Sequence, residues 1–213
     1  MGLIDLVKND DYTLGIWRVE ETEEELKVNV GGTHFPGLNK ITHHRRRLEW
    51  LAARSLLKEF GYQGFVKYHP SRRPFLANSR AHISISHSFP FVTVILSSNF
   101  LVGIDIEYYN RSFKSVTHKY LSEREKRWID QNDNKMLALI WSTKEALYKL
   151  PGMGGISGTD MDVKPIETIA NNGNLDAIIR IGGTVQRFNY IRYSYVGSFN
   201  VVWVCCNPRT LIW

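Results

Sequence analysis

Cysteine is scarce in this sequence, and long apolar runs are absent. The two cysteines, Cys205 and Cys206, are adjacent and lie in the apolar run 201–206. Neighbouring cysteines in a predicted strand do not form a disulfide framework, so we expect a reducing compartment. No run of about 18 apolar residues occurs, and charged residues are spread through residues 1–11, so we expect neither a membrane span nor a signal peptide. The sequence therefore predicts a cytoplasmic protein.

Two kinds of recognition motif are also missing, because the sequence has no zinc-ligand spacing and no Gly-rich aromatic RNA-binding motif. Basic residues are nevertheless in excess, with 27 lysines and arginines against 21 acidic residues and a formal net charge of +6. Part of this excess is the cluster 43–47, His-His-Arg-Arg-Arg. Such a charge favours an acidic partner or a polyanionic ligand, which leaves nucleic acid, an acidic protein and a phosphate-rich cofactor open.

Two amphipathic helices are predicted from apolar residues at helical spacing. The first lies between Asn39 and Phe60 and ends at Gly61. Its apolar stripe is formed by Leu48, Leu51, Ala52, Ser55 and Leu56. The second runs from about Asn134 to Leu150 and stops at the Pro-Gly pair 151–152. Between them, Ser122 is expected to begin a surface helix with glutamates in its first turn.

Segments rich in β-branched and aromatic residues predict the strands. They are residues 81–88, 91–96, 101–107, 177–181, 185–196 and 198–206. Together with the helices, they predict an α+β chain of 213 residues with two similar halves. Each half is expected to be a small, mainly antiparallel sheet packed with a long helix.

The strand 101–107 places two carboxylates on one face. Because side chains alternate along a strand, Gly103, Asp105 and Glu107 share the face opposite Ile104 and its apolar neighbours. Two carboxylates that point the same way repel each other unless a cation or solvent lies between them. A hard divalent cation with oxygen ligands suits this pair, and Gly103 is expected to leave room for a ligand to approach the backbone.

The second helix carries a lysine inside its apolar arc. At 100° per residue, the arc contains Leu137, Ile140, Trp141, Leu147 and Tyr148, with Lys144 in its middle. A buried lysine requires an anionic partner, so a carboxylate or a phosphate is expected beside it. Glu145 lies at the edge of the arc and Lys149 one turn further on, a pair that is also compatible with an ordinary surface ion pair.

These segments carry a family resemblance. Residues 103–107, Gly-Ile-Asp-Ile-Glu, followed by residues 141–149, Trp-Ser-Thr-Lys-Glu-Ala-Leu-Tyr-Lys, resemble the paired signature of the 4′-phosphopantetheinyl transferase superfamily. The family's Ser-His-Ser is matched upstream by residues 86–88. The chain length is similar to that of the longer Sfp type, a monomeric pseudo-dimer of two α/β halves. On that basis, we expect an N-terminal half at 1–103 on the 3′-phosphate side and a C-terminal half at 104–213 on the metal and pyrophosphate side.

The resemblance implies an enzyme and a site. Such transferases, also called holo-acyl-carrier-protein synthases, move the 4′-phosphopantetheine arm of coenzyme A to a serine of an apo acyl or peptidyl carrier protein, with magnesium, and release 3′,5′-ADP. The match makes Asp105, Glu107 and Glu145 the expected Mg²⁺ ligands, with Glu145, Lys149 and Asp105 as catalytic residues. Glu145, or a water that it polarises, is the expected general base.

The match also implies ligands for coenzyme A. These expected cofactor-binding residues are Arg45, Arg54, Arg73, Ser86, His87, Lys144 and Lys149. Arg73 stands where the family usually carries the lysine of a Gly-Lys-Pro loop; arginine keeps the charge and adds a bidentate grip on phosphate, but with a different geometry. The carrier protein is expected to dock through its acidic helix, with Met153 and Ile156 among the exposed candidates for the surface that meets it.

Two other functions remain open from the residues alone. A metal-dependent nuclease or phosphodiesterase would use the same carboxylates for metal and the cluster 43–47 for nucleic acid. A basic nucleic-acid-binding module would use the charge without catalysis. The resemblance favours carrier-protein modification, with no nucleic-acid or membrane partner.

Overall fold

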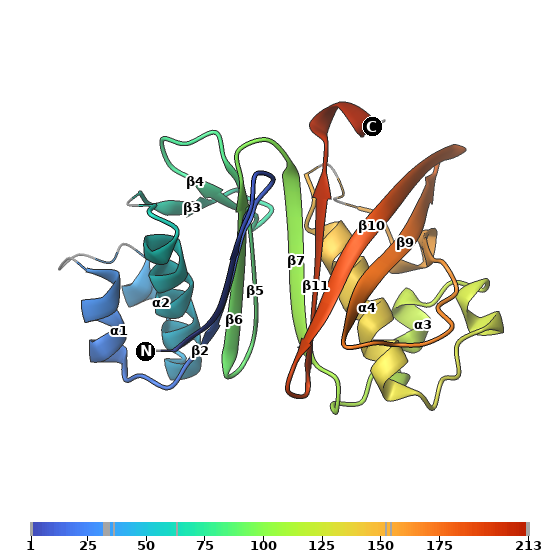
Figure 1. Cartoon of the computed structure of the whole chain (residues 1–213), viewed down its shortest axis with the longest axis horizontal. Helices are drawn as coiled ribbons and strands as arrows, with labels where there is room; N and C mark the ends of the chain where they lie inside the picture. The colour runs from blue at the N-terminus through green and yellow to red at the C-terminus, as the bar shows by residue number, and fades with distance from the viewer. Residues whose placement is uncertain are drawn as a thin grey trace. The chain divides into compact units, whose positions relative to one another are not determined.

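The chain folds into two units, residues 1–98 and 99–213. The computed structural model describes residues 2–31, 35, 37–62, 64–151, 153 and 155–211. Each unit has an antiparallel sheet and a long helix (Figure 1), which confirms the expected α+β class. The expected boundary at 103/104 falls inside the strand β7 (Leu101–Tyr108), which pairs along its whole length with β11 (Phe199–Cys206) of the second unit.

The first unit is built on a four-stranded sheet of order β1-β2-β6-β5. Its strands are β1 (Leu3–Lys8), β2 (Thr13–Arg18), β5 (His82–Ser88) and β6 (Phe91–Ser97). The long helix α2 (His44–Glu59) covers one face of this sheet, and α1 (Glu23–Val30) packs beside α2 (Figure 1). A separate two-stranded ribbon is formed by β3 (Val66–Tyr68) and β4 (Pro74–Leu76).

The apolar stripe predicted for the first helix faces this core. All five of its residues are buried on α2, from Leu48 to Leu56. A 3₁₀ turn, Leu38–Lys40, precedes the helix, so the predicted start near Asn39 is several residues early. Gly61 follows the helix with a φ of 81°, a left-handed conformation that glycine adopts without a steric penalty and that stops the helix there.

The second unit is built on a five-stranded sheet of order β7-β11-β10-β9-β8. The strands besides β7 and β11 are β8 (Met161–Val163), β9 (Asn172–Ile181) and β10 (Thr184–Val196). The helix α4 (Asn134–Tyr148) packs on β7 and β11, and the short helix α3 (Thr117–Tyr120) lies beside α4 (Figure 1). The predicted strands are confirmed within about two residues, except that β9 begins at Asn172 instead of 177.

Local capping and apolar burial explain where α4 lies. The Asp133 carboxylate accepts a hydrogen bond from the Met136 amide at 3.0 Å, which caps the N-terminus of the helix. Leu137, Ile140 and Leu147 are fully buried against the sheet, each worth about 1.5–3 kcal/mol of transfer free energy. Among the described residues, no helix combines the length and the apolar character that crossing a membrane requires.

Two sequence expectations for the second unit are wrong. Ser122 does not begin a surface helix: it precedes a 3₁₀ turn, Glu125–Arg127, and both Ser122 and Glu125 are buried. Met153 and Ile156 are also buried, so they are not part of an exposed docking surface. Glycine and proline around these residues indicated a surface loop, but the apolar side chains pack into the core of the second unit.

Candidate active site

Gly103 lets α4 approach β7 as closely as two backbones permit. A Cβ added to Gly103 would lie 1.9 Å from the carbonyl oxygen of Ala146, which no side chain tolerates. The sequence interpretation that Gly103 leaves room for a ligand is therefore corrected, because the helix backbone fills that room. The close approach brings the strand face that carries Asp105 and Glu107 against the turn that carries Glu145.

An ion pair joins the two motifs directly. Lys149 Nζ donates to Asp105 Oδ1 at 2.8 Å and to the main-chain oxygen of Ile104 at 2.9 Å. The Asp105 side chain is buried, whereas that of Lys149 is 27% exposed. Lys149 sits just after the last turn of α4, where its amide bonds to the oxygen of Glu145. The strand and helix segments that the motifs identified therefore form one site.

Glu107 is the second carboxylate of the strand face. Its Oε1 accepts hydrogen bonds from Trp141 Nε1 at 3.0 Å and from Arg111 Nη2 at 2.8 Å. Burial, followed by the negative charge of Asp105, raises the pKa of Glu107 from 4.5 to about 7. The sequence interpretation did not include Arg111, which follows the strand by a few residues and returns to it through its long side chain.

Glu145 faces the same negative charge from the helix. Burial and then the charge of Asp105 raise the pKa of the Glu145 carboxyl, while Lys149 and Arg111 oppose the rise. Glu145 also lines a pocket of about 280 Å³ together with Tyr120, Trp141 and Tyr148. A carboxyl with a raised pKa beside a pocket is suited to accept a proton from a bound hydroxyl group.

The chemistry of these three carboxylates fits a hard divalent cation. Their ligand atoms are all oxygens, and the pKa values of Glu107 and Glu145 are raised first by burial and then by the negative charge of Asp105, which a cation would offset. In this conformation, Lys149 and Arg111 supply the positive charge. Within the described part of the chain, no three Asp, Glu, His or Cys side chains converge closely enough to hold a metal as they stand.

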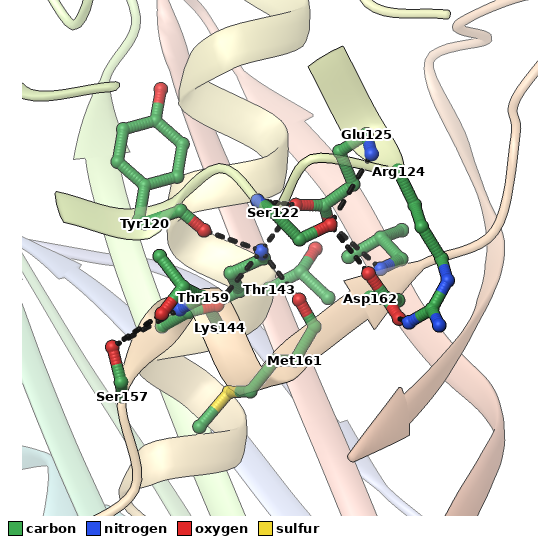
Figure 2. Close-up of polar contacts among 12 residues, drawn as sticks. Tyr120, Ser122, Arg124, Glu125, Thr143, Lys144, Ser157, Thr159, Met161 and Asp162 are labelled. Carbon is green, nitrogen blue, oxygen red and sulfur yellow. Dashed lines mark hydrogen bonds and ion pairs between the residues drawn. The ribbon is translucent and has the colours of Figure 1, made fainter. Parts of the chain in front are cut away.

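Lys144 does not point into the site. Its ammonium is buried and donates to Glu125 Oε2 at 2.5 Å and to three main-chain oxygens (Figure 2). The prediction of an anionic partner is confirmed, and the partner is a carboxylate. The expected role of Lys144 in binding coenzyme A is not supported, because its three N–H groups are already used inside the protein. Burial lowers the pKa of Lys144, and the charge of Glu125 opposes the shift.

In the first unit, the start of α2 meets the end of β5. The guanidinium of Arg45 lies 4.5 Å from the ring centroid of Phe89, which directly follows β5. Arg46 Nη1 lies 2.6 Å from His87 Nε2, and the other ring nitrogen of His87 faces the buried Glu49 at 3.4 Å. His87 and Arg45, two of the expected ligands, are therefore both at this end of the unit. Arg46 and Glu49 were missed, although they lie on the same helix as Arg45.

Ser86 lies on β5, one residue before His87, and is buried. Arg54 stacks on the ring of Trp50, with its guanidinium carbon 3.3 Å from the ring centroid, and donates to the Trp50 oxygen at 2.9 Å. Arg73 has a buried Nη2 with no hydrogen-bond partner among the described residues. Burial lowers the pKa of both guanidinium groups. A buried guanidinium N–H without a partner suits an anion, so Arg73 is the better phosphate ligand of the two.

Comparisons with known proteins agree with the motifs. Residues 101–195 match the model of the 4′-phosphopantetheinyl transferase superfamily. A Haemophilus influenzae protein named "Putative 4′-phosphopantetheinyl transferase" is 31% identical over 123 residues, which are 53% of this chain and 52% of that protein. The chain thus spans about half the length of this curated relative. The matched range contains β7, α4 and the three carboxylates, so the second unit of this chain is similar to the 4′-phosphopantetheinyl transferase superfamily over the elements that carry these residues.

Proposed function

We propose that this protein transfers the 4′-phosphopantetheine group of coenzyme A to a serine of an apo acyl or peptidyl carrier protein, as a holo-acyl-carrier-protein synthase. The observation that carries the proposal is the ion pair between Lys149 and Asp105, because it joins both family motifs at one acidic site. The family supports phosphopantetheinyl transfer in general. The carrier, the product and the residue roles are part of the proposal.

The proposed reaction is an in-line displacement at phosphorus. The serine oxygen forms a bond to the β-phosphorus of coenzyme A, and the bond from that phosphorus to the bridging oxygen breaks, so 3′,5′-ADP leaves with that oxygen. Glu145 accepts the serine proton, either directly or through a water molecule. Its raised pKa suits this task, since burial makes the Glu145 carboxylate a stronger base than an exposed glutamate.

Asp105, Glu107 and Glu145 are the residues that would hold a divalent cation, which we propose to be Mg²⁺. When bound, such an ion neutralises charge on the pyrophosphate. Lys149, which now pairs with Asp105, would contribute a second positive charge to binding the pyrophosphate. Arg111, which now pairs with Glu107, would contribute in the same way.

We assign the 3′-phosphate end of coenzyme A to the first unit. Arg45 and His87 lie at the meeting point of α2 and β5, with Ser86 next to His87. Arg73 brings a buried N–H that a phosphate oxygen would satisfy, and Arg54 adds charge from α2. Of the proposed coenzyme A ligands, only Lys144 is withdrawn. The positive net charge of +6 suits an acidic carrier protein, which the protein would meet as a monomer.

Neither alternative function has comparable support. The nuclease and the nucleic-acid-binding interpretations both relied on the basic cluster 43–47. In the structure, Arg46 contacts His87 and Arg47 forms a bidentate pair with Glu23, so part of that cluster serves contacts within the first unit. The family match concerns a transferase.

The proposal is tested by incubating the protein with coenzyme A, Mg²⁺ and a panel of apo carrier proteins. Intact mass spectrometry of each carrier should show the gain of one phosphopantetheine group. Carriers with their serine replaced by alanine, and reactions with a chelator, should show no gain. Absence of any gain across fatty acid, polyketide and nonribosomal peptide carriers would refute the proposed function.

A further inference from the structure

A buried lysine ties three separate segments of the second unit to one turn of α4. Lys144 Nζ donates to the main-chain oxygens of Tyr120 at 2.6 Å, Met161 at 2.7 Å and Gly158 at 3.0 Å. These oxygens belong to the end of α3, the start of β8 and the 3₁₀ turn before β8. Figure 2 shows Tyr120 and Met161 approaching the lysine from opposite sides. The lysine therefore acts as a junction for segments that are distant in the sequence.

Glu125 supplies the charge that makes this junction possible. Its carboxylate accepts from Lys144 Nζ at 2.5 Å, from the Ser122 amide at 2.9 Å and from the Val163 amide at 2.8 Å. The Glu125 amide in turn bonds to Ser122 Oγ at 3.2 Å, which completes a reciprocal capping box. Glu125 is fully buried, so each of its two oxygens has a partner where water is absent.

A second carboxylate holds the same segment from the other side. Asp162 Oδ1 accepts from Ser122 Oγ at 2.5 Å, and Asp162 Oδ2 accepts from Arg124 Nη1 at 2.9 Å (Figure 2). Arg180 of β9 also contacts this oxygen. These contacts fix the segment 122–125 to β8 and β9. The carboxylate of Glu125 is therefore held in place beside Lys144.

The junction lies next to the proposed catalytic group. Lys144 precedes Glu145 in the sequence, so a rotation of α4 that moves one moves the other. The three residues whose oxygens Lys144 holds, Tyr120, Gly158 and Met161, also line the pocket of about 280 Å³ that Glu145 lines. The contacts that satisfy Lys144 therefore hold the turn of α4 that carries Glu145 together with three other residues that line the same pocket.

We propose that Glu125 is a positioning residue for the transfer reaction. Through its ion pair with Lys144, it fixes the turn of α4 that presents Glu145 and the segments that line the pocket with Glu145. Because Glu125 is fully buried, it acts on the reaction through its contacts inside the protein, of which the ion pair with Lys144 reaches α4. This inference rests on the proposed phosphopantetheine transfer and adds to it a residue outside both sequence motifs.

The pair is expected to act as a unit. Removing one partner of a buried ion pair leaves the other charge without compensation, so the local structure rearranges. Glu125→Gln and Lys144→Met should each lower kcat about tenfold or more, which corresponds to ~1.4 kcal/mol or more of transition-state stabilisation. The KM for coenzyme A should change less than about threefold, because the proposed 3′-phosphate ligands lie in the first unit. In the double variant, the two losses should not multiply.

The experiment measures kcat and KM by carrier mass gain, first for the unchanged protein and then for the variants. Thermal unfolding confirms that each variant is folded at the assay temperature. If Glu125→Gln is not folded, Glu125→Asp replaces it, since it keeps the charge and withdraws the carboxylate by one methylene group. Glu23→Gln is the control, because it breaks the bidentate pair with Arg47 in the first unit and should leave kcat unchanged.

Each outcome bears on a separate claim. A selective loss of kcat in the Glu125 and Lys144 variants, without multiplication in the double variant, supports the positioning role. Wild-type kcat in a folded Glu125 variant, or losses that multiply, would overturn that role and leave the proposed function intact. Absence of transfer by the unchanged protein would remove the proposed function, and the inference with it, before any variant is compared.

Discussion

The carbonyl oxygen of Ala146 occupies the space where a side chain on Gly103 would begin, since a Cβ there would be only 1.9 Å away. Gly103 lies within β7 and the Ala146 carbonyl lies within α4, so neither position can shift unless the strand or the helix shifts with it. Because Gly103 has no Cβ, α4 can pack close to β7, and this packing sets the distance between the strand carboxylates and Glu145.

We predict that Gly103→Ala destabilises the protein by about 2–3 kcal/mol and lowers transfer activity sharply, because α4 must shift away from β7. Urea unfolding measures the first effect and carrier mass gain the second. Gly182→Ala is the control: its added Cβ meets no atom within 4 Å, and its φ of 54° should cost about 1 kcal/mol without affecting activity. Equal losses of activity in both variants would contradict the role of the close approach.

The raised pKa of Glu107 predicts that the free energy of unfolding depends on pH. Its pKa is raised from 4.5 to about 7, so the folded state binds the Glu107 proton more tightly than the unfolded state does. The stability from this group is fully present below about pH 4.5 and is lost as the pH rises through about 7, to an upper bound of about 3 kcal/mol. Glu145 contributes with the same sign.

Urea unfolding of the metal-free protein between pH 5 and pH 8 should therefore show stability falling with pH, and Glu107→Gln should reduce the fall. Added Mg²⁺ should flatten the profile in the unchanged protein, since the cation replaces the proton on the carboxylates. A profile that Glu107→Gln does not alter would show that this carboxyl keeps an ordinary pKa.

Glu145 is predicted to affect chemistry and not folding. Glu145→Gln should lower kcat by about 10²–10⁴-fold, the usual contribution of a general base, while the unfolding midpoint does not fall, since the raised pKa means that the charge of Glu145 does not stabilise the fold at neutral pH. Glu167→Gln, an identical change at an exposed position of the second unit, is the matched control and should retain full kcat. Full activity of Glu145→Gln would remove Glu145 from the proposed mechanism.

Arg73 is predicted to recognise the 3′-phosphate. Arg73→Ala should raise the KM for coenzyme A about 10- to 100-fold, the worth of one charge-assisted hydrogen bond, and should leave the KM for 3′-dephospho-coenzyme A almost unchanged. Arg72→Asn removes the neighbouring arginine, and asparagine tolerates the φ of 64° found there. An equal loss for both substrates in Arg73→Ala would assign Arg73 to another part of coenzyme A or to folding.

The two motifs and the elements that carry them were predictable because their signals are local. Alternation along β7 gave the shared face of Asp105 and Glu107, and helical spacing gave α4. The demand of Lys144 for an anionic partner was also predicted correctly, since a charge inside an apolar arc always carries that requirement. The strands β3, β4 and β8, of three residues each, are too short to show any period.

The errors concern contacts between distant residues. Nothing in the sequence tells whether the partner of Lys144 is a phosphate or Glu125, because both satisfy the same charge requirement. Gly103 was given a ligand-approach role, and only the packing of α4 shows that Ala146 takes that space. Arg111 was overlooked although its partner Glu107 is only four residues away, because residues after a strand have no fixed direction that the sequence reveals.

Lys149 bonds to the main chain of β7 as well as to Asp105, so the site forms only when α4 is docked on β7. The segments 103–107 and 141–149 approach each other only through the docking of α4 on β7, so no fragment of the second unit holds the acidic cluster by itself. Partial unfolding that releases α4 separates Glu145 and Lys149 from Asp105 and Glu107 of β7. Heat inactivation is therefore expected to coincide with the cooperative unfolding of the second unit.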